Sequence, residues 1–153
     1  MTEPVVEQIM ANVKTRMEAV FASAFRSTRI ATWQPKDAVV HVHQGALTPN
    51  AELSCPGNPP KQAYDVEAIV AGIVKPSDKD QVAIATFRNR MGASIIAAAT
   101  DATNWHQWGG LAINTTHGPV EDYQDESGGF SGVLVRFVIT YRTPENDPYT
   151  VSA

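Results

Sequence analysis

Cysteine is almost missing from this sequence, and charge is sparse. The 153 residues include a single cysteine, Cys55, which excludes an internal disulfide and a cysteine-rich zinc site. We expect Cys55 to be a free thiol on a surface loop, in a reducing compartment. Charged residues make up 18% of the chain, the formal net charge is −4, and the basic residues are scattered. This pattern argues against a protein that grips nucleic acid through a basic face.

Long apolar runs are missing as well. Charges interrupt the apolar residues near the N-terminus, which is not the pattern of a signal peptide. The longest apolar stretch falls far short of the roughly 20 residues that cross a bilayer as a helix. We therefore expect a soluble chain in the cytoplasm, without a membrane partner. A length of 153 residues suits one domain.

Sequence motifs of catalysis and nucleotide binding are also missing, among them GxGxxG, GxxxxGK[ST], GxSxG and HExxH. His41 and His43 share one face of a predicted strand, as two metal ligands would. The sequence brings neither His106 nor His117 near them. We expect two solvent-facing strand histidines, with no metal, no cofactor and no enzymatic activity. A small metal-dependent enzyme or ligand-binding domain is the alternative from a different class.

Apolar spacing predicts two amphipathic helices. The first begins around Pro4, which suits an initial turn, and is expected to end near Ser27. The second covers about residues 79–100, and Asp78 with Gln81 resembles a capping box at its start. Its expected buried side consists of Ile84, Phe87, Met91, Ile95 and Ala98 or Ala99.

Alternation of apolar and polar residues predicts the strands. They cover residues 29–33 (a short one), 37–47, 62–76, 113–124 and 132–142. In the last of these, one face is apolar and the other is mixed, so we expect the mixed face to be partly covered. The stretch TPNAELSCPGNPPK, residues 48–61, holds four prolines and is expected to be an exposed loop without regular structure.

The predicted order is helix, strand, strand, helix, strand, strand, with the short strand after the first helix. This order favours an α+β fold, in which two helices pack on a mainly antiparallel sheet of four to five strands. We expect residues 1–143 to form a single domain and residues 144–153 to form an extended C-terminal tail.

The last predicted hairpin carries a resemblance to a known family. Its turn is EDYQDESGGFSG, and its second strand closes on VITY and continues into RTPENDPY. With the element order of nearly the whole chain, it resembles the tail terminator (tail completion) proteins of long-tailed bacteriophages. The chain departs from that family in its extension TPENDPYTVSA, which is also common in other neck and tail-completion proteins. The alternative is therefore another phage neck protein, such as a head–tail connector.

The resemblance implies a structural virion protein with a fold related to that of tail-tube proteins. Family members form a homo-hexameric ring on the head-proximal end of the tail tube, stop its polymerisation and provide the surface for head–tail joining. The implied partners are other copies of the chain, the tail tube protein and a connector or neck protein. Genomic DNA would pass through the ring without sequence-specific binding. The implied location is the tail or neck of the virion, after assembly in the host cytoplasm.

Two sets of residues are candidates within such a ring. An acidic turn is expected to face the lumen or the tube below, where its charge would repel the phosphates of DNA. It consists of Asp122, Asp125 and Glu126. The tail is expected to lie on a neighbouring subunit. Its candidate contacts are Arg142, Asp147, Pro148 and Tyr149.

Overall fold

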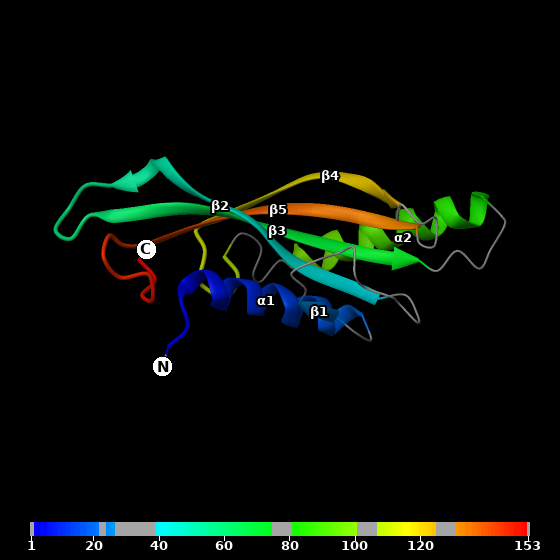
Figure 1. The fold of residues 1–153 in the computed structure, drawn as a ribbon, viewed down its shortest axis with the longest axis horizontal. Helices are drawn as coiled ribbons and strands as arrows, with labels where there is room; N and C mark the ends of the chain where they lie inside the picture. The colour runs from blue at the N-terminus through cyan, green and yellow to red at the C-terminus, as the bar shows by residue number, and fades with distance from the viewer. Residues whose placement is uncertain are drawn as a thin grey trace.

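The computed structural model describes residues 2–21, 24–26, 39–74, 81–100, 107–124 and 131–152. These residues form two helices and one five-stranded sheet (Figure 1). In chain order the elements are α1 (Val5–Val20), β1 (Ala24–Arg26), β2 (Val39–Cys55), β3 (Lys61–Val74), α2 (Gln81–Ala99), β4 (Asn114–Gln124) and β5 (Ser131–Pro144). The predicted α+β class is therefore confirmed, and the sheet is open, mixed and mostly antiparallel.

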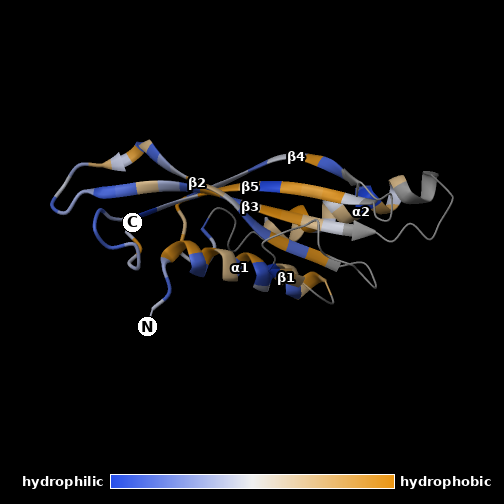
Figure 2. Cartoon of the chain, viewed as in Figure 1, coloured by the Kyte–Doolittle hydropathy of each residue, from blue (hydrophilic) through white to orange (hydrophobic). Residues whose placement is uncertain are grey.

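The sheet joins two hairpins side by side. Its strand order is β1-β2-β3-β5-β4, and every neighbouring pair is antiparallel except β1 with β2. The hairpins β2–β3 and β4–β5 meet along the full length of β3 and β5, from Lys61 opposite Pro144 to Val74 opposite Ser131. As the inner strands of the sheet, β3 and β5 carry long apolar stretches (Figure 2).

The first helix is shorter than predicted. It ends at Val20, and Phe21 already has an extended backbone, with φ −109° and ψ 140°. Residues 24–26, which belong to the predicted helix, form β1 instead, and Ala24 is buried opposite Val40. The prediction of a helix to Ser27 was wrong because pairing with β2 outweighs the local helical periodicity. The short strand predicted over residues 29–33 lies outside the described residues.

The prediction of a loop over residues 48–61 was also wrong. β2 continues to Cys55, and β3 begins at Lys61. Only residues 56–60 form the turn between them. Irregular register between Gln44 and Leu47 and between Asn50 and Cys55 shows where β2 departs from a regular ladder. We call residues 47–65 of this hairpin, together with residues 140–144 of β5, the arm; it extends past the helices in Figure 1.

Proline is tolerated within the arm because β2 is an edge strand there. Among the described residues, β1 pairs with the outer side of β2 only from Val40 to Val42. Beyond those residues, a proline facing that side removes no ladder hydrogen bond. Pro49 therefore fits within β2, opposite Tyr64. A segment that contains proline can therefore be a strand when it lies at the edge of the sheet, and the sequence alone does not show which strand is at the edge.

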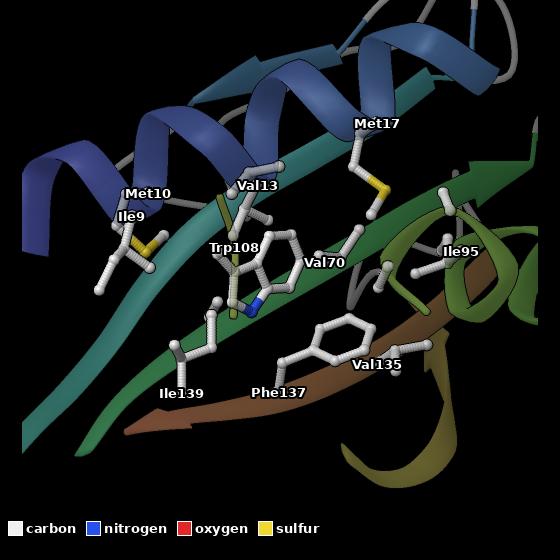
Figure 3. Packing of buried hydrophobic residues seen from close by; sticks show 14 of the residues in the cluster. Ile9, Met10, Val13, Met17, Val70, Ile95, Trp108, Val135, Phe137 and Ile139 are labelled. Carbon is white, nitrogen blue, oxygen red and sulfur yellow. The ribbon is translucent and has the colours of Figure 1, made fainter. Parts of the chain in front are cut away.

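Both helices pack on the same face of the sheet and share one core. Residues that pair across neighbouring strands point to the same face of the sheet. Val66 pairs with Ile139, and Val70 pairs with Val135. All four side chains are fully buried. Figure 3 shows Val70, Phe137 and Ile139 directed toward α1 and toward Trp108. The helices contribute Val5, Ile9, Met10, Val13, Met17, Met91, Ile95, Ala98 and Ala99 to the core. The predicted apolar face of β5 is confirmed.

The buried side of α2 was largely predicted. Met91, Ile95 and the alanines at its C-terminal end are buried as expected, whereas Phe87 is 42% exposed, so that part of the prediction was wrong. The side chain of Ile84 lies outside what the structure describes. Gly72 of β3 allows the close contact, because a Cβ there would lie 2.5 Å from Cγ of Met91.

Candidate assembly edges and the open sheet face

The face of the sheet opposite the helices, which we call the open face, has a mixed character. It carries Asp65 opposite Thr140, Glu67 opposite Val138 and Ile69 opposite Arg136. Its exposure is uneven: Ile69 is buried, with 7% of its surface exposed, whereas Val138 is 37% exposed. The mixed face that the sequence predicted for β5 is therefore present, and both α1 and α2 leave it uncovered.

Arg136 ties three strands together on the open face. Its Nη1 lies 2.6 Å from Oε1 of Glu67 in β3, and its Nε lies 3.2 Å from Oε2 of Glu121 in β4. Hydrogen bonds to Glu67 and then to Glu121 raise the pKa of the Arg136 guanidinium above its usual range. Both carboxylates thus have a cationic partner within the sheet.

A second polar group holds the arm together. Asp65 in β3 accepts a hydrogen bond of 2.5 Å from Oγ1 of Thr140 in β5. It also accepts from Nδ2 of Asn50 in β2, at 3.1 Å for the shorter contact. Beside Asp65 lies a shallow hollow of about 240 Å³, lined by Ala46, Thr48, Asp65, Glu67 and Val138. Both carboxylates that line the hollow, those of Asp65 and Glu67, form hydrogen bonds within the sheet, which indicates a structural role.

The arm has two edges that could pair with another strand. On one side, the outer edge of β2 from Gln44 to Cys55, the edge away from β3, has no partner strand among the described residues. On the other side, β5 pairs with β4 only up to Thr140, opposite Asn114, although β5 itself continues to Pro144. Wherever the backbone of such an edge is unpaired, it is a template for pairing with a further chain.

The predicted acidic turn is only partly within the described residues. Asp122 lies in β4 opposite Val133, and its side chain is 74% exposed. Its Oδ2 is 3.6 Å from Nη1 of Arg88 in α2, so it forms an ion pair at the edge of the helical layer. Asp125 and Glu126 lie outside the described residues. Whether the three carboxylates face a lumen stays a prediction.

The tail contacts its own subunit. Arg142 donates from Nε to the carbonyl oxygen of Leu53 at 2.7 Å, and Pro148 accepts a hydrogen bond of 2.9 Å from the N–H of Val5. Asp147 accepts within the tail from the N–H of Tyr149, while the Tyr149 side chain is 48% exposed. The predicted tail is therefore hydrogen-bonded to its own subunit, through Pro148 to α1 and through Ser152 to β5. Contacts of these residues with a neighbouring subunit stay a prediction.

The histidine pair does not form a metal site with the described residues. His41 and His43 lie on the open face, opposite Ala71 and Ile69. The expectation that both face solvent was wrong for His41, which is 3% exposed, and burial lowers its pKa to about 4. His117 lies in β4 opposite Phe137, hence on the helical face. Within the described ranges, His, Cys, Asp and Glu form no group of three suited to a metal ion.

Cys55 belongs to the end of β2 and not to a loop. Its side chain is half-buried, and its Sγ lies 3.8 Å from the carbonyl oxygen of Leu53. It is a free thiol, as the cysteine count required.

The polar groups of the open face were not singled out from the sequence. Glu67 and Arg136 lie on the mixed faces of two predicted strands. Their opposite charges are the signal in the sequence that could have suggested an ion pair. It becomes informative only once β3 and β5 are known to be neighbours, because their pairing brings together residues far apart in the chain.

Neither described helix combines the length and the apolar character that a bilayer-spanning helix needs. The chain matches no protein-family model, and a search of curated proteins finds no match.

Proposed function

We propose that this chain is a structural virion protein, a tail terminator of a long-tailed bacteriophage that acts as a homo-hexameric ring. The ring caps the head-proximal end of the tail tube, stops its polymerisation and provides the surface for head–tail joining. The proposed fold is of the tail-tube type. Its partners are the tail tube protein and a connector or neck protein, and genomic DNA passes through it without sequence-specific binding.

One observation carries this proposal: both helices pack on one face of the sheet, and the arm has two separate edges. Among the described residues, the outer edge of β2 beyond Val42 has no further partner strand, and β5 beyond Thr140 carries the C-terminal tail. A ring built from strand edges needs this arrangement, because each copy must offer two surfaces that do not coincide. The polar groups of the open face support a structural role, since Glu67, Glu121 and Asp65 are held by partners in the sheet.

Negative-stain imaging of the purified protein, with and without tail tubes of the same phage, tests the proposal. We expect rings with a central hole, or added density at one end of each tube, and a ring mass of about 100 kDa for six copies of the 16.6 kDa chain. Tubes alone and tubes with an unrelated small protein are the controls. Bare tube ends at saturating protein would contradict the terminator and direct attention to the head–tail connector alternative.

A further inference from the structure

The C-terminal tail occupies one of the two arm edges. The chain before β4 reaches this edge at Ile113, whose N–H donates to the carbonyl oxygen of Thr140 at 2.8 Å. Carbonyl groups two residues apart on a strand point to the same side, so Arg142 offers the next acceptor along the edge. That acceptor is taken by the N–H of Ser152, at 2.9 Å. The tail thus continues the row of hydrogen bonds beyond the start of β4.

This tail segment, residues 145–152, is attached mainly through its backbone. The N–H of Glu145 donates to the carbonyl oxygen of Pro60, and the carbonyl oxygen of Pro148 accepts from the N–H of Val5, both at 2.9 Å. None of its eight residues is buried, and the side chain of Val151 is 37% exposed. Backbone hydrogen bonds near solvent add little net stability, because water replaces them when they open. The segment can therefore leave the edge without exposing a core.

The second arm edge, β2 from Gln44 to Cys55, lies on the far side of β3. β2 and β5 are both antiparallel to β3, so they run in the same direction. In a cyclic ring all copies have the same orientation about the axis, and each contact joins two different surfaces. The β5 edge of one copy can then pair, in parallel, with the β2 edge of the next.

We propose that residues 145–152 act as a releasable strap that keeps the chain from self-associating by covering the β5 edge. The occupant that replaces the strap is β2 of a second copy. Release at the tube end would couple ring formation to the presence of a tube. The role in assembly rests on the proposed function, whereas the blocking of self-association is a property of the chain itself.

Two matched pairs of full-length variants test the strap. Ser152→Pro removes the N–H that binds Arg142, and Ser152→Ala keeps it. Val5→Pro removes the N–H that binds Pro148 at a first-turn helix position that tolerates proline, and Val5→Ala keeps that N–H while shortening the same buried side chain.

Sedimentation velocity over a range of concentrations gives the readout. We expect each proline variant to self-associate at about threefold lower concentration than its alanine partner, and the double proline variant at lower concentration still. Hydrogen exchange of the assembled double variant should show new protection at amides within residues 44–55, apart from Pro49, which has none, and at Arg142 on the outer edge of β5.

Three results would overturn the strap. Proline and alanine variants with equal self-association would show that the tail blocks no edge. Proline variants that associate less would favour the tail as an inter-subunit contact. New protection confined to β4 would assign the contact to another edge. Tube capping is measured separately. If the variants cap tubes but their association curves are unchanged, only the strap is refuted. If the strap is released but no tube is capped, only the terminator function is refuted.

Discussion

The buried imidazole of His41 gives the fold a pH dependence of known sign. Burial lowers its pKa from 6.5 to about 4, and the ring lies beside that of Phe25 at 5.9 Å between centroids. The unfolded chain therefore binds a proton at His41 at a higher pH than the folded chain does. The contribution of neutral His41 to stability is present above pH 6.5 and is lost as the pH falls toward 4.

Urea unfolding at a series of pH values between 7 and 4 measures this effect. We expect His41 to contribute a loss of about 1.4 kcal/mol per pH unit within that window, and about 3 kcal/mol in total. The slope is taken as the difference between the natural chain and His41→Gln, because other groups titrate equally in both. Identical slopes for the natural chain and His41→Gln would refute this account.

At the scale of elements, the contact between α2 and the sheet depends on a strand glycine. A Cβ at Gly72 would lie 2.5 Å from Cγ of Met91 and 3.2 Å from Cδ1 of Ile95. We expect Gly72→Ala to lower the free energy of unfolding by about 1–3 kcal/mol, because the helix must shift away from β3.

Thermal and urea unfolding would measure the change, with Gly118→Ala in β4 as the control. A Cβ at Gly118 would find its nearest neighbour at 3.8 Å, an ordinary contact. That variant should stay within about 0.5 kcal/mol of the natural chain. If both variants have the same stability, the close approach of α2 does not set the packing here.

The elements that the sequence predicted well are those whose pattern reflects one buried face. β5 is the clearest case, because Val133, Val135, Phe137, Ile139 and Tyr141 alternate and all five are buried. Predictions failed where a distant partner decides the local structure. The helix α1 ends early because residues 24–26 pair with β2. Pro49 lies in a strand because the outer edge of that strand has no partner strand among the described residues. Neither partner can be read from neighbouring residues.

The candidate edges were less predictable than the elements. The resemblance predicted inter-subunit contacts for the last strand and the tail, and the hydrogen bonds observed for Arg142 and Pro148 are those with Leu53 and Val5. Those contacts lie within the subunit, because Leu53 and Val5 come close only after the sheet and α1 have assembled. The side-chain hydrogen bonds from Arg136 to Glu67 and to Glu121 likewise depend on the order of the strands.

For the whole molecule, the acidic turn provides a test that depends on the proposed ring. Replacing Asp122, Asp125 and Glu126 by lysine turns a repulsive surface into one that holds DNA phosphates. We expect the yield of infectious particles to fall roughly tenfold or more, because DNA passage or head–tail joining is impaired. The measurement is plaque titre after complementation of a phage that lacks the natural chain.

The control replaces the same three residues by Asn, Asn and Gln, which removes charge without reversing it. A melting curve of each variant separates a folding defect from a lumen effect, since Asp122 also pairs with Arg88. A lysine variant that folds and gives a normal titre would remove these residues from the lumen.

The position of β3 between β2 and β5 also has a consequence for synthesis. Val70 pairs with both Val42 and Val135, so one of its partners is made long after it. At about 5–20 residues per second, a ribosome needs several seconds to add β5 after β3 has emerged. During that time the most apolar part of β3 has one bare edge, which favours aggregation. Asp65 and Glu67, on that strand, keep charge beside the bare edge until Thr140 and Arg136 arrive to bind them.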